Sequence, residues 1–200
     1  MIRFVERVEQ HAGAPLTGSP LLDRIYRQRG ITSREELEYA PARLLPTESL
    51  KGIDQAAELL IEAIRQDKRI IVVGDYDADG ATATTVMVEG LKSLGAKDVR
   101  FLIPNRFEYG YGLSTGIVAL AGKQSPDLIV TVDAGISSLD GARAVKSLPH
   151  PCKLLITDHH LPGPALPEDA DAIVNPNQPG CEFPSKALAG CGVAFYVVLH

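Results

Sequence analysis

Apolar and polar positions change their pattern once along the chain, near residue 67. Before that point, proline and glycine interrupt short amphipathic stretches, and an apolar stripe at helical spacing is clearest over residues 54–66. After it, runs of β-branched and leucine residues alternate with helical patterns. We therefore predict a small helical lead-in over residues 1–67 and a larger α/β domain over residues 68–200.

Five apolar runs in the second part have the length of buried strands. The predicted strands cover residues 69–74, 99–103, 127–132, 153–157 and 172–174, and the predicted helices cover about 81–94, 114–122, 138–148 and 192–199. Strands that alternate with helices predict a five-stranded, mainly parallel sheet with helices on both faces. The last helix has neither a polar end nor a glycine stop, and so we expect the domain to be truncated on its C-terminal side.

Acidic and imidazole side chains stand directly after three of the predicted strands. In chain order, they are Asp75, Asp77, Asp79, Asp133, Asp158, His159 and His160. Because the C-terminal ends of parallel strands meet at one edge of a sheet, we expect these side chains to converge there. Carboxylates that crowd together repel one another unless a cation lies between them, and oxygen ligands favour Mg²⁺ or Mn²⁺. The pattern predicts a catalytic site with two divalent ions, suited to phosphoryl transfer.

The residues of this predicted site would take different roles. Asp133 would bridge the two ions, and His159 would ligate as a neutral imidazole. His160 would either ligate or donate a hydrogen bond to the phosphate. The aspartate run also matches the first half of an EF-hand loop, but Val86 stands where that loop needs glutamate. An EF-hand calcium-binding loop is therefore excluded.

The loop after the second predicted strand combines a cation with aromatic side chains. Arg106, Phe107, Tyr109 and Tyr111 stand in it, and Lys186 follows the last short strand. Aromatic rings stack on bases and cations hold phosphates, which is how single strands are bound without sequence reading. We predict these five residues as nucleic-acid contacts. The alternatives are a loop anchored by aromatic packing and a solvated lysine.

Composition adds limits to this interpretation. The net charge of −5 argues against a surface coated with cations for nucleic acid, although a local basic groove would fit. Cys152, Cys181 and Cys191 lack C-x-x-C spacing, and so we interpret them as inert thiols of a reducing compartment. The chain opens with no apolar leader, and no apolar run reaches about 18 residues. We expect a cytoplasmic protein without a membrane partner.

Three short motifs together resemble those of the DHH phosphoesterase superfamily. They are Asp77-Ala78-Asp79-Gly80, Val132-Asp133-Ala134-Gly135 and Asp158-His159-His160. From about residue 20 onward, the sequence is also similar to one branch of that superfamily, the single-stranded-DNA exonucleases. The segments that carry this second similarity include Pro104-Asn105-Arg106-Phe107, Gly110-Tyr111-Gly112-Leu113, Asn175-Pro176-Asn177 and Gly190-Cys191-Gly192-Val193.

The resemblance implies a metal-dependent phosphodiesterase that digests single-stranded DNA from its 5′ end in recombination and repair. Mn²⁺ or Mg²⁺ would be the cofactor, and single-strand-binding protein and repair helicases would be further partners. The implied metal ligands are Asp77, Asp79, Asp133 and His159, with His160 as a ligand or a phosphate contact. Asp158 would orient a histidine, Asp75 would adjoin the site or ligate, and the 106–113 loop would touch the DNA.

The resemblance is incomplete at one point. The superfamily has a fourth motif, a further metal-binding aspartate well after the DHH triplet, and it is not found in these 200 residues. This implies an incomplete metal cage and weak or absent activity for this stretch by itself. Two other functions stay open. One is another DHH hydrolase, acting on short oligonucleotides, cyclic dinucleotides or pyrophosphate, and the other is a non-catalytic nucleic-acid-binding module.

Overall fold

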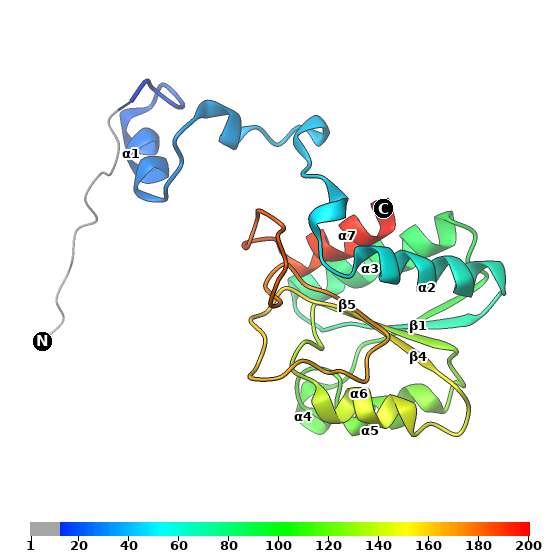
Figure 1. Ribbon diagram of the computed structural model, residues 1–200. Coiled ribbons are helices and arrows are strands. Elements are labelled where there is room, and N and C mark those ends of the chain that lie inside the picture. Colours follow the sequence, from blue (N-terminus) through cyan, green and yellow to red (C-terminus); the bar gives the residue numbers. More distant parts are fainter. Residues whose placement is uncertain (1–12) are drawn as a thin grey trace, which may run out of the picture. The chain divides into compact units, whose positions relative to one another are not determined.

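The computed structural model describes residues 13–200, except for the side chain of Arg106. The chain divides into two compact units, one ending at Leu45 and one running Pro46–His200 (Figure 1). This division differs from the predicted boundary after residue 67. Residues 46–67 fold with the sheet, because helix α2 (Ile53–Arg65) packs against strand β5 (Ala172–Val174).

The described part of the first unit is short and helical. Helix α1 spans Pro20–Gln28, and 3₁₀ turns follow at Arg34–Leu37 and Pro41–Arg43. The carboxylate of Asp23 accepts hydrogen bonds from the backbone N–H groups of Leu16 and Thr17, at 3.1 and 2.8 Å. These bonds close the preceding turn onto the helix.

The second unit is built on five parallel strands. In addition to β5, they are β1 Arg69–Val73, β2 Asp98–Leu102, β3 Leu128–Val132 and β4 Lys153–Thr157, in the order β2-β1-β3-β4-β5. Every neighbouring pair in this described sheet runs parallel. The predicted α/β class and the five-stranded parallel sheet are therefore confirmed.

Helices cover both faces of the sheet (Figure 1). On one face lie α2, α3 (Ala78–Ser93) and α7 (Gly190–Leu199), and on the other lie α5 (Thr115–Gly122) and α6 (Leu139–Lys146). Successive strand residues point to opposite faces. Thus Ile71, Val73 and Ile129 form one buried cluster with Ile117 of α5 and Val145 of α6. None of the helices in residues 13–200 has both the length and the apolar character needed to cross a membrane.

Helix α3 begins three residues before the predicted start, at Ala78. Asp77 caps it, because its Oδ1 accepts a hydrogen bond from the Gly80 N–H at 2.9 Å. Asp79 consequently lies in the first turn, and Asp75 precedes the helix. The segment predicted as a loop after β2 also contains one short helix, α4 (Arg106–Tyr109).

The strand order decides which loops meet. Strands β1, β3 and β4 are direct neighbours in the sheet, although other elements separate them in sequence. Because they are parallel, the loops that follow them leave from the same edge. That edge carries the predicted acids and histidines.

Candidate metal centre

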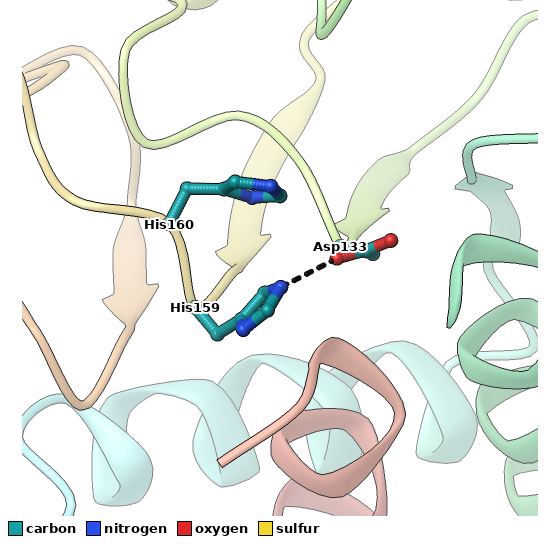
Figure 2. Close-up of side chains that lie close together, drawn as sticks. All are labelled: Asp133, His159 and His160. Carbon is teal, nitrogen blue, oxygen red and sulfur yellow. Dashed lines mark ion pairs between the residues drawn. The ribbon is translucent and has the colours of Figure 1, made fainter. Parts of the chain in front are cut away.

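Three side chains from the loops after β3 and β4 point toward one another at this edge (Figure 2). They are Asp133, His159 and His160, and one ligand atom of each lies within 4.8 Å of those of the other two. Asp133 Oδ1 is 3.1 Å from His159 Nε2, and Asp79 Oδ2 is 3.6 Å from the same nitrogen. The structure thus brings together ligand candidates from three separate parts of the sequence.

Asp133 is the most buried of these groups, at 2% exposure. Its backbone is left-handed, with φ at 57°, which turns the chain sharply as β3 ends. Oδ1 is buried without a hydrogen-bond partner among the described residues, because the contact with His159 Nε2 lacks hydrogen-bond geometry. Burial raises the pKa of Asp133 to about 7, and the charges of Asp79 and Asp77 act in the same direction. A buried carboxylate oxygen that lacks a donor, beside an imidazole nitrogen, suits a shared cation.

Asp79 is held differently from Asp133. The backbone N–H of Gly190 donates to its Oδ2 and that of Cys191 to its Oδ1, both at 2.8 Å. Burial alone would raise the pKa of Asp79, but these bonds and the neighbouring His159 outweigh it and hold the pKa below its usual value. The site therefore combines one carboxyl that resists ionisation with one that ionises readily.

The other two aspartates of the run are not in the group of three. Asp77 is exposed and caps α3, as described above. Asp75 is 6% exposed, and its Oδ1 accepts a hydrogen bond from the Tyr76 N–H at 2.7 Å. Asp77 is nevertheless close enough to raise the pKa of Asp133, and so it belongs to the same electrostatic environment.

Asp158 anchors the histidine loop, which carries His159 and His160. It is 1% exposed, and its Oδ1 accepts hydrogen bonds from the His159 N–H at 2.7 Å and the His160 N–H at 3.1 Å. The same oxygen lies 2.8 Å from His160 Nδ1, and Oδ2 accepts from the Ile136 N–H at 2.9 Å. Burial lowers the pKa of His160, but Asp158 and the charge of Asp133 outweigh it and raise the pKa.

Two asparagines after β5 fix the other side of the histidine loop. Asn175 Nδ2 donates to the carbonyl of His160 at 3.0 Å, and Asn177 Nδ2 donates to that of His159 at 2.6 Å. Lys186 Nζ binds the segment that carries these asparagines, because it donates to the carbonyls of Pro176 and Cys181, at 2.6 and 2.9 Å. The backbone of the histidine loop is thus held by contacts from Asp158 and from the two asparagines.

The predicted nucleic-acid contacts separate into different positions. The hydroxyl of Tyr111 lies 3.2 Å from the ring nitrogens of His160, which brings this residue to the centre. Phe107 is 94% exposed, and Tyr109 is partly buried against the core cluster that includes residues of α5. The ammonium of Lys186 is bonded to two carbonyls, and the Arg106 side chain lies outside the described part of the structure.

The sequence interpretation missed the contribution of α7 to the centre. Gly190 and Cys191 bind Asp79 through their backbone N–H groups, which every residue except proline carries, and the Cys191 thiol interacts with the same carboxylate. No side-chain pattern marks the two backbone bonds. The available signal was the small residues at the start of an otherwise apolar helix.

Comparison with known sequences points to one family. A model of the DHH family, N-terminal domain, matches residues 69–199. The single-stranded-DNA-specific exonuclease RecJ of Salmonella typhimurium is 52% identical over 191 residues, which is 96% of this chain and 33% of that protein. The RecJ protein of Escherichia coli is 50% identical over 192 residues, again 96% of this chain and 33% of that protein. The chain spans about a third of the length of these curated relatives.

Solved structures of exonuclease RecJ also resemble this chain. A crystal structure of exonuclease RecJ bound to manganese has a TM-score of 0.68 and 42% sequence identity, over 78% of this chain and 38% of that one. The RecJ protein of Thermus thermophilus in complex with Mn²⁺ has a TM-score of 0.67 and 39% identity, over 86% of this chain and 23% of that one. The fold of most of this chain is thus shared with these proteins.

Proposed function

The chain belongs to the DHH family, and we propose that it is the N-terminal part of a metal-dependent phosphodiesterase that digests single-stranded DNA. RecJ relatives about 50% identical to it carry the name of single-stranded-DNA-specific exonucleases. The proposed cofactor is Mn²⁺ or Mg²⁺, the ions named for the RecJ structures that resemble this chain.

One observation carries the proposal. Asp133 Oδ1 is buried, has no hydrogen-bond donor among the described residues, and faces an imidazole nitrogen at 3.1 Å. An ionised carboxylate in that position is unfavourable unless a cation compensates it. We propose Asp77, Asp79, Asp133 and His159 as the residues that hold the ions, with Asp75 next to the site, against Gly80 of the first turn of α3. Divalent ions, when bound, stabilise the charge that builds on phosphate oxygens.

The histidines and Asp158 have distinct proposed tasks. Asp158 fixes the rotation of His160 through the 2.8 Å contact with Nδ1, and Nε2 lies 3.2 Å from the hydroxyl of Tyr111. Because the pKa of His160 is raised, its ring carries a proton more readily than an ordinary histidine. We propose that His160 donates a hydrogen bond to a phosphate oxygen, or ligates an ion in its neutral form.

We propose that the DNA strand approaches along the loop of residues 106–113. Phe107 is exposed for stacking on a base, and Tyr111 lies where the loop meets His160. Arg106, Tyr109 and Lys186 complete the proposed set of contacts. For Lys186, such a contact requires exchange of at least one of its carbonyl bonds for a phosphate.

The remaining parts of the proposal rest on resemblance to the exonuclease branch. They are digestion from the 5′ end, a role in recombination and repair, single-strand-binding protein and repair helicases as partners, and a cytoplasmic location. The first three of these concern the handling of a DNA substrate.

A nuclease assay tests the proposal directly. Because the chain spans about a third of its relatives, the assay uses the protein at their full length. Labelled single-stranded and double-stranded DNA are incubated with Mn²⁺ or with a chelator. We expect cleavage of the single strand only, and loss of cleavage on chelation. Equal cleavage of both DNAs, or cleavage that survives chelation, would contradict the proposal.

Asp133→Asn and Asp140→Asn form a matched pair for this assay. Both remove one carboxylate charge, but Asp140 is an exposed residue whose carboxylate pairs with Arg143 at 3.3 Å. We expect Asp133→Asn to abolish cleavage and Asp140→Asn to retain it. Equal losses in the two variants would show that net charge, and not the metal centre, controls cleavage.

A further inference from the structure

The first turn of α7 contacts the candidate metal centre through its backbone. The N–H groups of Gly190 and Cys191 bind the two oxygens of Asp79, one each, at 2.8 Å. These groups belong to the first turn of a helix, where N–H groups have no partner within the helix and the helix dipole favours negative charge. Since both oxygens are held, the carboxylate cannot rotate freely about its Cβ–Cγ bond.

The same turn also lies against Asp133. A Cβ atom added to Gly190 would be 2.5 Å from Asp133 Oδ1 and 2.7 Å from Asp133 Cβ. Such distances are too short for any side chain, and so only glycine allows the backbone to approach this closely. One peptide segment therefore touches both carboxylates of the candidate centre.

The rest of α7 is anchored away from the centre. Tyr196 packs its ring edge against Phe183, with the ring centroids 5.1 Å apart, and both residues are buried. A Cβ added to Gly90 of α3 would lie 2.5 Å from Val198 Cγ1, so the two helices are in close contact. Helix α3 carries Asp79, and α7 carries the donors that hold it. Their packing fixes the distance between the two.

We propose that the N–H groups of Gly190 and Cys191 form a backbone clamp that positions Asp79 to bind a divalent ion. The inference rests on the proposed metal-dependent function. A carboxylate has about four acceptor positions, so Asp79 retains a position for an ion after it accepts the two N–H groups and the contact of the Cys191 thiol. A ligand oriented before the ion arrives loses less freedom on binding. Groups that orient metal ligands typically contribute about 10- to 100-fold to metal affinity.

A pair of alanine substitutions in the first turn of α7 tests the clamp. Gly190→Ala inserts a methyl group against Asp133, whereas Gly192→Ala inserts the same group against only the flexible side chain of Leu188, 2.6 Å away. Both substitutions replace a glycine of α7 with alanine, so the change in intrinsic helix propensity is the same. The Mn²⁺ affinity of the protein at the full length of its relatives is measured by titration, with detection of free Mn²⁺ by electron paramagnetic resonance. We expect Gly190→Ala to bind Mn²⁺ at least about tenfold more weakly than Gly192→Ala.

A second pair isolates one N–H group. Cys191→Pro and Cys191→Ala both lose the thiol, but only the proline variant loses the N–H that donates to Asp79 Oδ1. Proline is tolerated in the first turn of a helix, since N–H groups there have no intrahelical partner. We expect Mn²⁺ to bind the proline variant about tenfold more weakly than the alanine variant. Circular dichroism of the metal-free proteins verifies that each is folded.

The outcomes separate this inference from the proposed function. Suppose that the unaltered protein binds Mn²⁺ and that the Mn²⁺ affinities of the two variants in each pair agree within about twofold. The proposed clamp is then wrong, while the metal-dependent function stands. If the unaltered protein binds no Mn²⁺, the metal-dependent function and the clamp both fail. If Cys191→Pro does not fold, equal Mn²⁺ affinities of Gly190→Ala and Gly192→Ala still overturn the clamp.

Discussion

The hydroxyl of Tyr111 lies 3.2 Å from the ring nitrogens of His160 and 3.3 Å from the carbonyl oxygen of Asp133. A residue predicted from the aromatic loop as a base contact therefore reaches the candidate metal centre. The rings of Tyr111 and His160 meet edge to face, with their centroids 5.7 Å apart. Tyr111 thus connects the loop of residues 106–113 to both His160 and the backbone of Asp133.

We predict that Tyr111→Phe lowers the rate of DNA cleavage about fivefold, because one neutral hydrogen bond contributes about 1 kcal/mol. The ring remains for stacking, and no predicted metal ligand is removed, so Mn²⁺ affinity should change less than about twofold. Single-turnover cleavage and Mn²⁺ titration measure the two effects. Tyr39→Phe is the control, since Tyr39 is 89% exposed and lies in the first unit. A loss of Mn²⁺ affinity as large as the loss of rate would assign Tyr111 to ligation instead.

Asp133→Asn should stabilise the metal-free protein while abolishing its stabilisation by Mn²⁺. The ionised carboxylate is buried next to other acids, and asparagine removes that charge while tolerating the left-handed backbone. At about pH 8, we expect the free energy of unfolding without metal to rise by on the order of 2 kcal/mol. Mn²⁺ at about 100 times its Kd should add about 2.7 kcal/mol to the unaltered protein only. Urea denaturation with Mn²⁺ or with a chelator measures both effects, and a variant destabilised in the metal-free state would contradict the prediction.

Asp171 should make a pH-dependent contribution to stability. Its carboxylate pairs with Lys146 at 2.6 Å and Lys153 at 2.9 Å and accepts the Leu154 N–H at 2.8 Å. Burial raises the pKa of Asp171, but these partners outweigh it and lower the pKa below its ordinary value of 3.8. Its stabilisation is therefore complete above about pH 4 and is lost as the pH falls through the lowered pKa.

Asp171→Asn should accordingly cost about 1–3 kcal/mol of unfolding free energy at neutral pH, and progressively less under acid conditions. Urea denaturation across a pH series measures this difference. The control is Asp67→Asn, because Asp67 pairs with Lys97 at 2.7 Å on the surface, with both side chains more than half exposed. An exposed pair of this kind contributes about 0–1 kcal/mol. A constant cost of Asp171→Asn across the pH series would show that its charge is not what stabilises the fold.

Gly52→Ala should destabilise the second unit much more than Gly95→Ala. Both glycines have positive φ, at 83° and 99°, so both substitutions carry the same conformational cost of about 1 kcal/mol. A Cβ at Gly52 would in addition collide with the carbonyl oxygen of Ile173 in β5, whereas one at Gly95 meets no atom within 4 Å in the described structure. Thermal unfolding of the two variants measures the difference. Equal destabilisation would indicate that residues 46–67 are not packed on the sheet.

The sequence contained most of the information for the sheet and for the positions of the candidate ligands. Strands and helices appeared in the predicted order, because burial on one or both faces imposes a local period on apolar residues. Asp133, His159 and His160 converge as expected, because parallel strands present their C-terminal ends together. The least accurate predictions were the boundary at residue 67 and the start of α3. Both depended on contacts that sequence periodicity does not record.

Local sequence thus determined which segments become strands and helices and which side chains follow each strand, since those features depend on neighbours a few residues away. Only the tertiary structure decided that β1, β3 and β4 are adjacent, that α7 holds Asp79, and that Tyr111 reaches His160. The reason is physical. The donors from α7 are backbone N–H groups, common to nearly all residues, and their partners lie more than a hundred positions away, as with Asp79 and Cys191. Such contacts exist only once the packing of whole elements has fixed the distance between them.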